Sequence, residues 1–121
     1  MSNKFCVTIT HCRQDADKAT VGFVVANAAL GSDKETLVFL STDGVWAAVE
    51  GELEKVDVGG PFAPLEDLVG KFVAGGGRIL VCAPCLKLRG IEETRLVEGA
   101  SPAGGAALVE FLQDGTPCVG Y

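Results

Sequence analysis

The chain has few of the features that mark proteins acting on nucleic acids or in membranes. Only 10 of its 121 residues are Lys or Arg, against 16 Asp or Glu, so the formal net charge is -6 at pH 7. The basic residues are scattered and form no stripe, which argues against nucleic acid as a partner. No apolar run approaches the about 20 residues of a membrane span. We therefore expect neither a nucleic-acid partner nor a membrane.

The cysteines do not have the arrangement of a disulfide framework. There are five, an odd number, and their spacing matches no common scaffold. A strand-like run at residues 5–10 begins so early that we expect no signal peptide before it. These features predict a cytoplasmic protein whose cysteines are thiols. Cys6 and Cys118 are expected to pack inside the first and last strands.

Short apolar runs alternate with longer helical segments along the chain, and 48% of the residues are hydrophobic. This pattern predicts an α/β protein, a three-layer α/β/α sandwich with a mostly parallel sheet of about five strands. The length suits a single domain over residues 1–121. We place the strands at residues 4–10, 36–40, 78–81, 94–97 and 116–121.

Helices are predicted between these strands. The first covers residues 15–30, with Asp15 as its N-cap and Gly31 as its stop. It is apolar nearly all round, so we expect it to be sandwiched in the domain or covered by another subunit. Ser101 and Pro102 are interpreted as an N-cap and a first helical residue. The other helices are expected at residues 45–53, 65–74, just after Cys82, and from Pro102 to about residue 113.

The segment after the strand at 78–81 is the first candidate site. That strand ends in Cys82, and Pro84 lies near the first turn of a short helix. The N–H groups at a helix N-terminus favour negative charge, so we expect the pKa of Cys82 to lie below that of a free thiol. Lys87 and Arg89 follow within two turns and should act in the same direction. The segment predicts sulfur chemistry.

Two other strands also end in residues able to bind or react. His11 and Cys12 follow the first strand, and Asp43 follows the second. The carboxyl ends of parallel strands share one edge of a sheet, where open α/β folds place their sites. We therefore take His11, Cys12 and Asp43 as candidate binding residues around Cys82. His11 as a base or as a turn cap, and Asp43 as a site residue or as a helix cap, both remain open.

A sequence pattern of higher specificity is Cys-x6-Arg-Gly-Ile at residues 82–91, directly after a strand. With Asp43-Gly44-Val45 after the second strand and the Ala/Gly-rich residues 101–112, it resembles the DsrE/DsrF-like family, which includes the TusD-type sulfur-relay subunits. The resemblance implies that Cys82 carries sulfane sulfur as a persulfide. It also implies sulfur donor and acceptor proteins or small thiols as partners, a homotrimer or homohexamer, and no cofactor.

Cys85 leaves alternatives open, because it forms a CxxC pair where the relay subunits carry one Cys. It is either a thiol that resolves a persulfide on Cys82 or a packing residue. A zinc site from Cys82, Cys85, Cys12 and His11 would need a second CxxC pair, which the chain lacks. A thioredoxin-like protein would need a β-hairpin half that we do not find. A non-catalytic oligomeric protein that binds a ligand in the same cleft is the remaining alternative.

Overall fold

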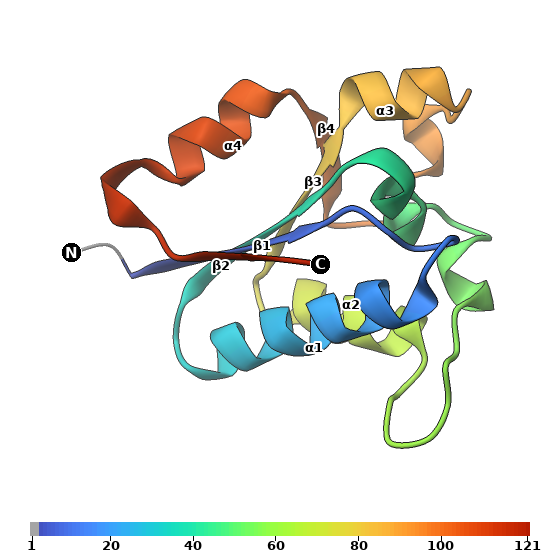
Figure 1. The fold of residues 1–121 in the computed structure, drawn as a ribbon, viewed down its shortest axis with the longest axis horizontal. Helices are drawn as coiled ribbons and strands as arrows, with labels where there is room; N and C mark the ends of the chain where they lie inside the picture. The colour runs from blue at the N-terminus through green and yellow to red at the C-terminus, as the bar shows by residue number, and fades with distance from the viewer. Residues whose placement is uncertain (1–2) are drawn as a thin grey trace.

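The computed structural model describes residues 3–121 (Figure 1). Its centre is one five-stranded sheet with the order β4-β3-β2-β1-β5, in which all neighbouring strands are parallel. The predicted mostly parallel α/β sheet is confirmed. The strands are β1 (Lys4–Ile9), β2 (Glu35–Leu40), β3 (Arg78–Cys82), β4 (Ala100–Ala103) and β5 (Cys118–Gly120).

Helices cover both faces of this sheet. Helices α1 (Ala16–Gly31) and α2 (Leu65–Ala74) lie side by side on one face, and α4 (Gly105–Phe111) lies on the other (Figure 1). Side chains alternate along each strand, so β1, β2 and β3 each contribute to two cores. Along β3, for example, Ile79 and Val81 belong to the core under α1 and α2, and Leu80 belongs to the core under α4.

Helix α1 begins and ends close to where the sequence predicted. The carboxylate of Asp15 accepts the N–H of Lys18 at 3.2 Å, which satisfies one free donor of the first turn. The buried face of α1 packs on the sheet, and Phe23 meets Phe72 of α2 edge-on at 5.8 Å between ring centroids. The nearly all-apolar helix thus packs on the sheet with one face and beside α2 in the same layer, and its outer face is open, with Val24 36% exposed. Within residues 3–121, no helix is long and apolar enough to cross a membrane.

The predicted helix over 45–53 is wrong. Its place is taken by two 3₁₀ helices, η1 (Thr42–Ala48) and η2 (Leu53–Lys55). Between them Gly51 has φ +88°, a left-handed conformation that no continuous helix contains. The predicted strand at 94–97 is also absent. Glu93–Arg95 form another short 3₁₀ helix, η3, and Leu96 makes only a single antiparallel bridge to Val49.

The interpretation of Ser101 and Pro102 as a helix start is corrected as well. Both residues lie in β4, paired with Leu80 and Val81 of β3, and α4 begins only at Gly105. Proline is tolerated there because β4 is an edge strand, where one side of the backbone needs no ladder bond. The other edge strand, β5, explains a further correction. Cys118 is exposed because this three-residue strand has a neighbour on one side only.

Candidate functional site

The candidate site lies where β1, β2 and β3 end. Cys82 is the last residue of β3 and also the N-cap of helix α3 (Ala83–Leu88), which carries Pro84 in its first turn. The chain therefore passes directly from a buried strand into a short helix, at the upper end of β3 in Figure 1. Cys82 and Cys85 are both half-buried free thiols. The CxxC pair is accessible at the sheet edge that the sequence predicted.

Cys85 is held by the end of β2. The backbone N–H of Thr42 donates a hydrogen bond to the Sγ of Cys85 at 3.2 Å. Thr42 has φ +50°, which is rare for a β-branched residue and marks backbone strain. Its hydroxyl donates to the carbonyl of Thr10 at 2.7 Å, which ties this strained turn to the end of β1. The arrangement fixes a backbone donor against sulfur.

The electrostatics of Cys82 differ from the expectation. Burial raises the pKa of the Cys82 thiol, and its side-chain hydrogen bond with Cys85 raises it further. The backbone N–H of Cys85 and the charge of Arg89 lower that pKa, but by less. The predicted depression was wrong because α3 has only six residues, so its aligned dipoles offset little of the cost of burying a thiolate.

The two basic residues of α3 take different positions. Arg89 is half-buried, and its Nη1 donates to the main-chain carbonyl of Cys85 at 3.2 Å. The guanidinium charge therefore lies beside the CxxC turn. Its hydrogen bond also satisfies a main-chain carbonyl of the short helix α3. Lys87 is exposed on α3. Of the two, only Arg89 is placed by a defined contact with the thiol pair.

Asp43 is a buried carboxylate that connects two of the turns around the site. It is 6% exposed, and its Oδ2 accepts the N–H groups of Cys12 at 2.6 Å and Gln14 at 3.0 Å. The carboxylate thus joins the end of β2 to the loop after β1. Burial, followed by the charge of Asp43, raises the pKa of Cys12 to about 12. Cys12 is 1% exposed, which makes it a core thiol and not an open ligand.

His11 reaches the same network by another route. Its Nδ1 shares a 2.8 Å hydrogen bond with the hydroxyl of Thr10, and the carbonyl of Thr10 accepts from Thr42. Two residues therefore connect the imidazole to the amide that holds Cys85. This favours the turn-cap interpretation of His11, with the ring fixed by a local bond.

Among residues 3–121, no group of three or more His, Cys, Asp or Glu side chains is gathered as a metal site would require. The zinc alternative needed Cys12 as a ligand, and that thiol lies in the core. The chemistry that the site offers is therefore that of two neighbouring thiols, each supplied with a backbone N–H.

Sequence reasoning did not single out Thr42 as a site residue. The carboxylate of its neighbour Asp43 is a recognisable binding or capping group, whereas Thr42 contributes only its backbone N–H. The available signal was position, since Thr42 follows the strand that pairs with β3.

A model of the DsrE/DsrF-like family matches residues 3–118. The chain belongs to this family. Among curated relatives of this DsrE/DsrF-like protein is MJ0989 of Methanocaldococcus jannaschii, 30% identical over 111 residues, which cover 92% of this chain and 93% of that one. MJ0760 of the same organism is 35% identical over 98 residues, or 81% of this chain. The match spans only 35% of the length of MJ0760.

Solved structures show the same fold. The ychN protein from E. coli superposes with a TM-score of 0.81 at 17% identity, covering 100% of both chains. MTH1491 from Methanobacterium thermoautotrophicum gives 0.69 at 17% identity over 98% of both chains. BT1422 from Bacteroides thetaiotaomicron gives 0.65 at 19% identity, covering 100% of this chain and 98% of that one. At these identities the likeness concerns the fold alone.

Proposed function

We propose that this DsrE/DsrF-like protein handles sulfane sulfur, with Cys82 accepting it as a persulfide and passing it to another thiol. One observation carries the proposal. Cys82 and Cys85 are half-buried free thiols three residues apart, at the end of β3 and the start of α3, within a family whose sulfur-relay members the chain resembles at this cysteine. Nucleophilic thiols need such partial exposure, because the incoming sulfur must reach them.

The proposed transfer is a pair of thiol–disulfide exchange steps. The Cys82 thiolate attacks the terminal sulfur of a donor R–S–SH, its S–S bond breaks, R–S⁻ leaves and Cys82–S–SH forms. An acceptor thiolate R′–S⁻ then attacks the terminal sulfur of Cys82–S–SH, giving R′–S–SH and the Cys82 thiolate. No electrons are gained or lost overall.

The surrounding groups have defined parts in this scheme. The N–H of Cys85 lies against the sulfur of Cys82, where it stabilises the thiolate that attacks and leaves. The charge of Arg89 acts in the same direction. Cys85, held by the N–H of Thr42, is placed to attack the inner sulfur of Cys82–S–SH. That step forms the Cys82–Cys85 disulfide and releases HS⁻.

The partners follow from this chemistry. Donor and acceptor are proteins or small thiols that carry sulfane sulfur, in the reducing cytoplasm, where thiols persist. We also propose that the protein is a homotrimer or homohexamer. Leu88 of α3 and Val109 of α4 are 82% and 66% exposed, and burial of such side chains stabilises assembly.

A second candidate, thiol–disulfide oxidoreduction by the CxxC pair, is favoured by the two half-buried free thiols three residues apart at the start of α3. The two functions differ in their product. A relay protein gains one sulfur atom on Cys82, whereas an oxidoreductase loses two hydrogens and forms a disulfide.

The experiment is incubation of the reduced protein with inorganic polysulfide, followed by peptide-resolved mass spectrometry. In the Cys85→Ala variant, where no neighbouring thiol can resolve the persulfide, we expect one added sulfur on Cys82, and none in Cys82→Ser. The matched control is Cys118→Ser, which removes an exposed thiol on another edge of the sheet and should leave the transfer unchanged. Sulfur retained by the Cys82→Ser variant would refute the assignment, and a Cys82 that gains no sulfur in the Cys85→Ala variant would favour oxidoreduction.

A further inference from the structure

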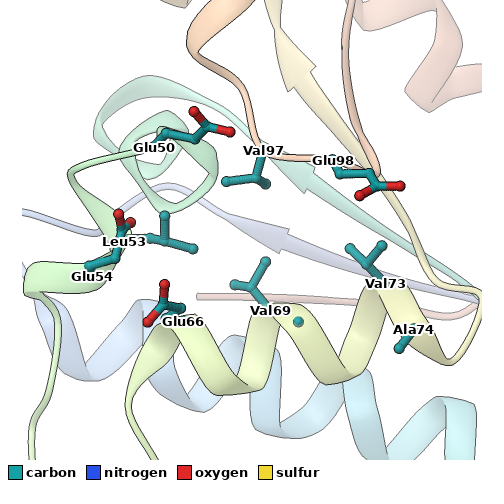
Figure 2. A pocket seen from close by; sticks show the side chains of 10 residues that line it. Glu50, Leu53, Glu54, Glu66, Val69, Val73, Ala74, Val97 and Glu98 are labelled. Carbon is teal, nitrogen blue, oxygen red and sulfur yellow. The ribbon is translucent and has the colours of Figure 1, made fainter.

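A second feature lies apart from the thiols, between α2 and the segments that hold residues 50–54 and 97–98. It is a groove of about 690 Å³ (Figure 2). Its floor is aliphatic and is made by Leu53, Val69, Val73 and Val97. Its rim carries four carboxylates, those of Glu50, Glu54, Glu66 and Glu98. The groove shares no lining residue with the Cys82 site.

One wall of the groove is a straight face of α2. Residues 66, 69, 70, 73 and 74 line it, and this spacing puts them on one side of a helix. They extend over about 12 Å at 1.5 Å per residue. Gly70 adds no side chain to this wall, and a Cβ there would meet no atom within 4 Å. The backbone of an incoming segment could therefore approach α2 closely.

All charges that line the groove are negative. Glu50, Glu66 and Glu98 are exposed, and Glu54 accepts the N–H of Gly51 at 2.9 Å. Arg95 donates to the main-chain carbonyl of Glu50 at 3.1 Å and is not part of the lining. The complement of this surface is an apolar ridge flanked by Lys or Arg.

We propose that this groove binds a basic amphipathic helix of a partner protein. Apolar residues at positions i, i+3/i+4 and i+7 of that helix lie on Val69, Val73 and the rest of the floor, and its Lys or Arg residues pair with the rim glutamates. The proposal is independent of the sulfur chemistry, because no residue of the CxxC turn takes part.

Two other occupants fit the groove less well. A second copy seated groove to groove would bring two sets of four glutamates together, on chains that each carry a net charge of -6. A small ligand is usually oriented by a few polar groups inside its pocket, whereas here the only polar side chains of the lining are the rim carboxylates.

The test uses a fluorescent helical peptide of Leu and Lys, with Leu at i, i+3, i+4 and i+7, in anisotropy titrations with the full-length protein. The double variant Glu66→Lys/Glu98→Lys should weaken binding by about tenfold or more. The control Glu35→Lys/Glu110→Lys makes the same charge change outside the groove lining and should alter binding by about twofold or less. A peptide with Ser in place of Leu should not bind, because the floor contacts are lost.

Three results would overturn the proposal. Equal weakening by both double variants would mean unspecific attraction to an acidic protein. Displacement of the peptide by 1,8-diaminooctane at a lower concentration than unlabelled peptide would make a small amine the occupant. Dissociation of an oligomer by the groove variant, seen by light scattering, would make the occupant a second copy. Failure of polysulfide transfer to Cys82 would leave this proposal untouched.

Discussion

The backbone N–H of Thr42 donates to the sulfur of Cys85 over 3.2 Å, and so joins the end of β2 to the helix that follows β3. The bond exists because Thr42 takes a left-handed conformation, with φ +50°. That conformation is costly for a β-branched residue, and the hydrogen bond from its hydroxyl to Thr10 offsets part of the cost. Strain of this kind at a strand end is typical of a functional turn.

Two substitutions of Thr42 separate its backbone strain from the hydroxyl hydrogen bond to Thr10 that offsets part of that strain. Thr42→Gly removes a strain of about 1 kcal/mol and a hydrogen bond of similar worth, so we expect the free energy of unfolding to change by less than about 1 kcal/mol. Thr42→Val keeps the strain and loses the hydrogen bond, so it should lower that free energy by about 1–2 kcal/mol. Urea denaturation measures both. Equal losses for the two variants would contradict the account.

Gly44 offers a second test of the same turn. A Cβ on Gly44 would overlap the carbonyl oxygen of Ile9, a backbone atom that cannot turn aside. We expect Gly44→Ala to lower the free energy of unfolding by about 1–3 kcal/mol. In the control Gly70→Ala, the new methyl meets no atom within 4 Å and improves helix propensity, so stability should rise by about 0.5–1 kcal/mol. A neutral Gly44→Ala would show that β1 and η1 are further apart.

Periodicity predicted the regular parts of this fold because local and tertiary preferences agree there. Residues 65–74 form a helix with the predicted bounds, and Asp15 caps α1. The helix start predicted at Ser101 and Pro102 was wrong because serine followed by proline also fits an edge strand. Only the pairing with β3 distinguishes a helix start from an edge strand here. Cys118 was placed in the core because sequence does not show which strand is at the edge.

The candidate site was predictable in position but not in electrostatics. The strand-to-helix transition at Cys82 and the convergence of strand ends follow from the order of elements. The pKa of Cys82 depends on how deeply the thiol is buried and on its bond to Cys85, which are products of packing. Thr42 acts through its backbone N–H. Every residue except proline has such a group, so the residue type does not reveal this role.

Assembly is tested by light scattering. We expect a mass that is a multiple of 12.5 kDa, near three or six chains, because Leu88 and Val109 expose apolar surface on α3 and α4. Leu88→Glu should lower the mass if α3 lies in the interface, and Val24→Glu on α1 serves as the comparison at a 36% exposed position. A monomer at micromolar concentration would exclude the homo-oligomer.

The CxxC pair predicts a specific oxidation product. Since Cys82 and Cys85 are half-buried free thiols three residues apart at the start of α3, mild oxidation should join them within one chain. Cys85→Ala should instead accumulate the Cys82 persulfide after polysulfide treatment, because no thiol remains to attack it. Peptide mapping under non-reducing conditions distinguishes the products. Two free thiols after oxidation would reduce Cys85 to a packing residue.

The pH dependence of Cys82 alkylation tests the electrostatics directly. Burial raises the pKa of Cys82, so its thiolate forms at higher pH than in an ordinary cysteine, and the rate of reaction with iodoacetamide should reach half its maximum at a correspondingly higher pH. The rate is followed by fragmentation of the peptide in the mass spectrometer, because Cys85 lies on the same peptide and its alkylation must be separated from that of Cys82.

Two variants should move that midpoint in opposite directions. Cys85→Ala removes a neighbour whose thiol raises the pKa of Cys82 but keeps the backbone N–H that lowers it, so the midpoint should fall. Arg89→Met removes a charge that lowers this pKa, so the midpoint should rise. Lys87→Met is the matched control on the same helix and should shift it less. A wild-type midpoint below that of free cysteine would restore the activated thiolate that the sequence predicted and contradict the burial argument.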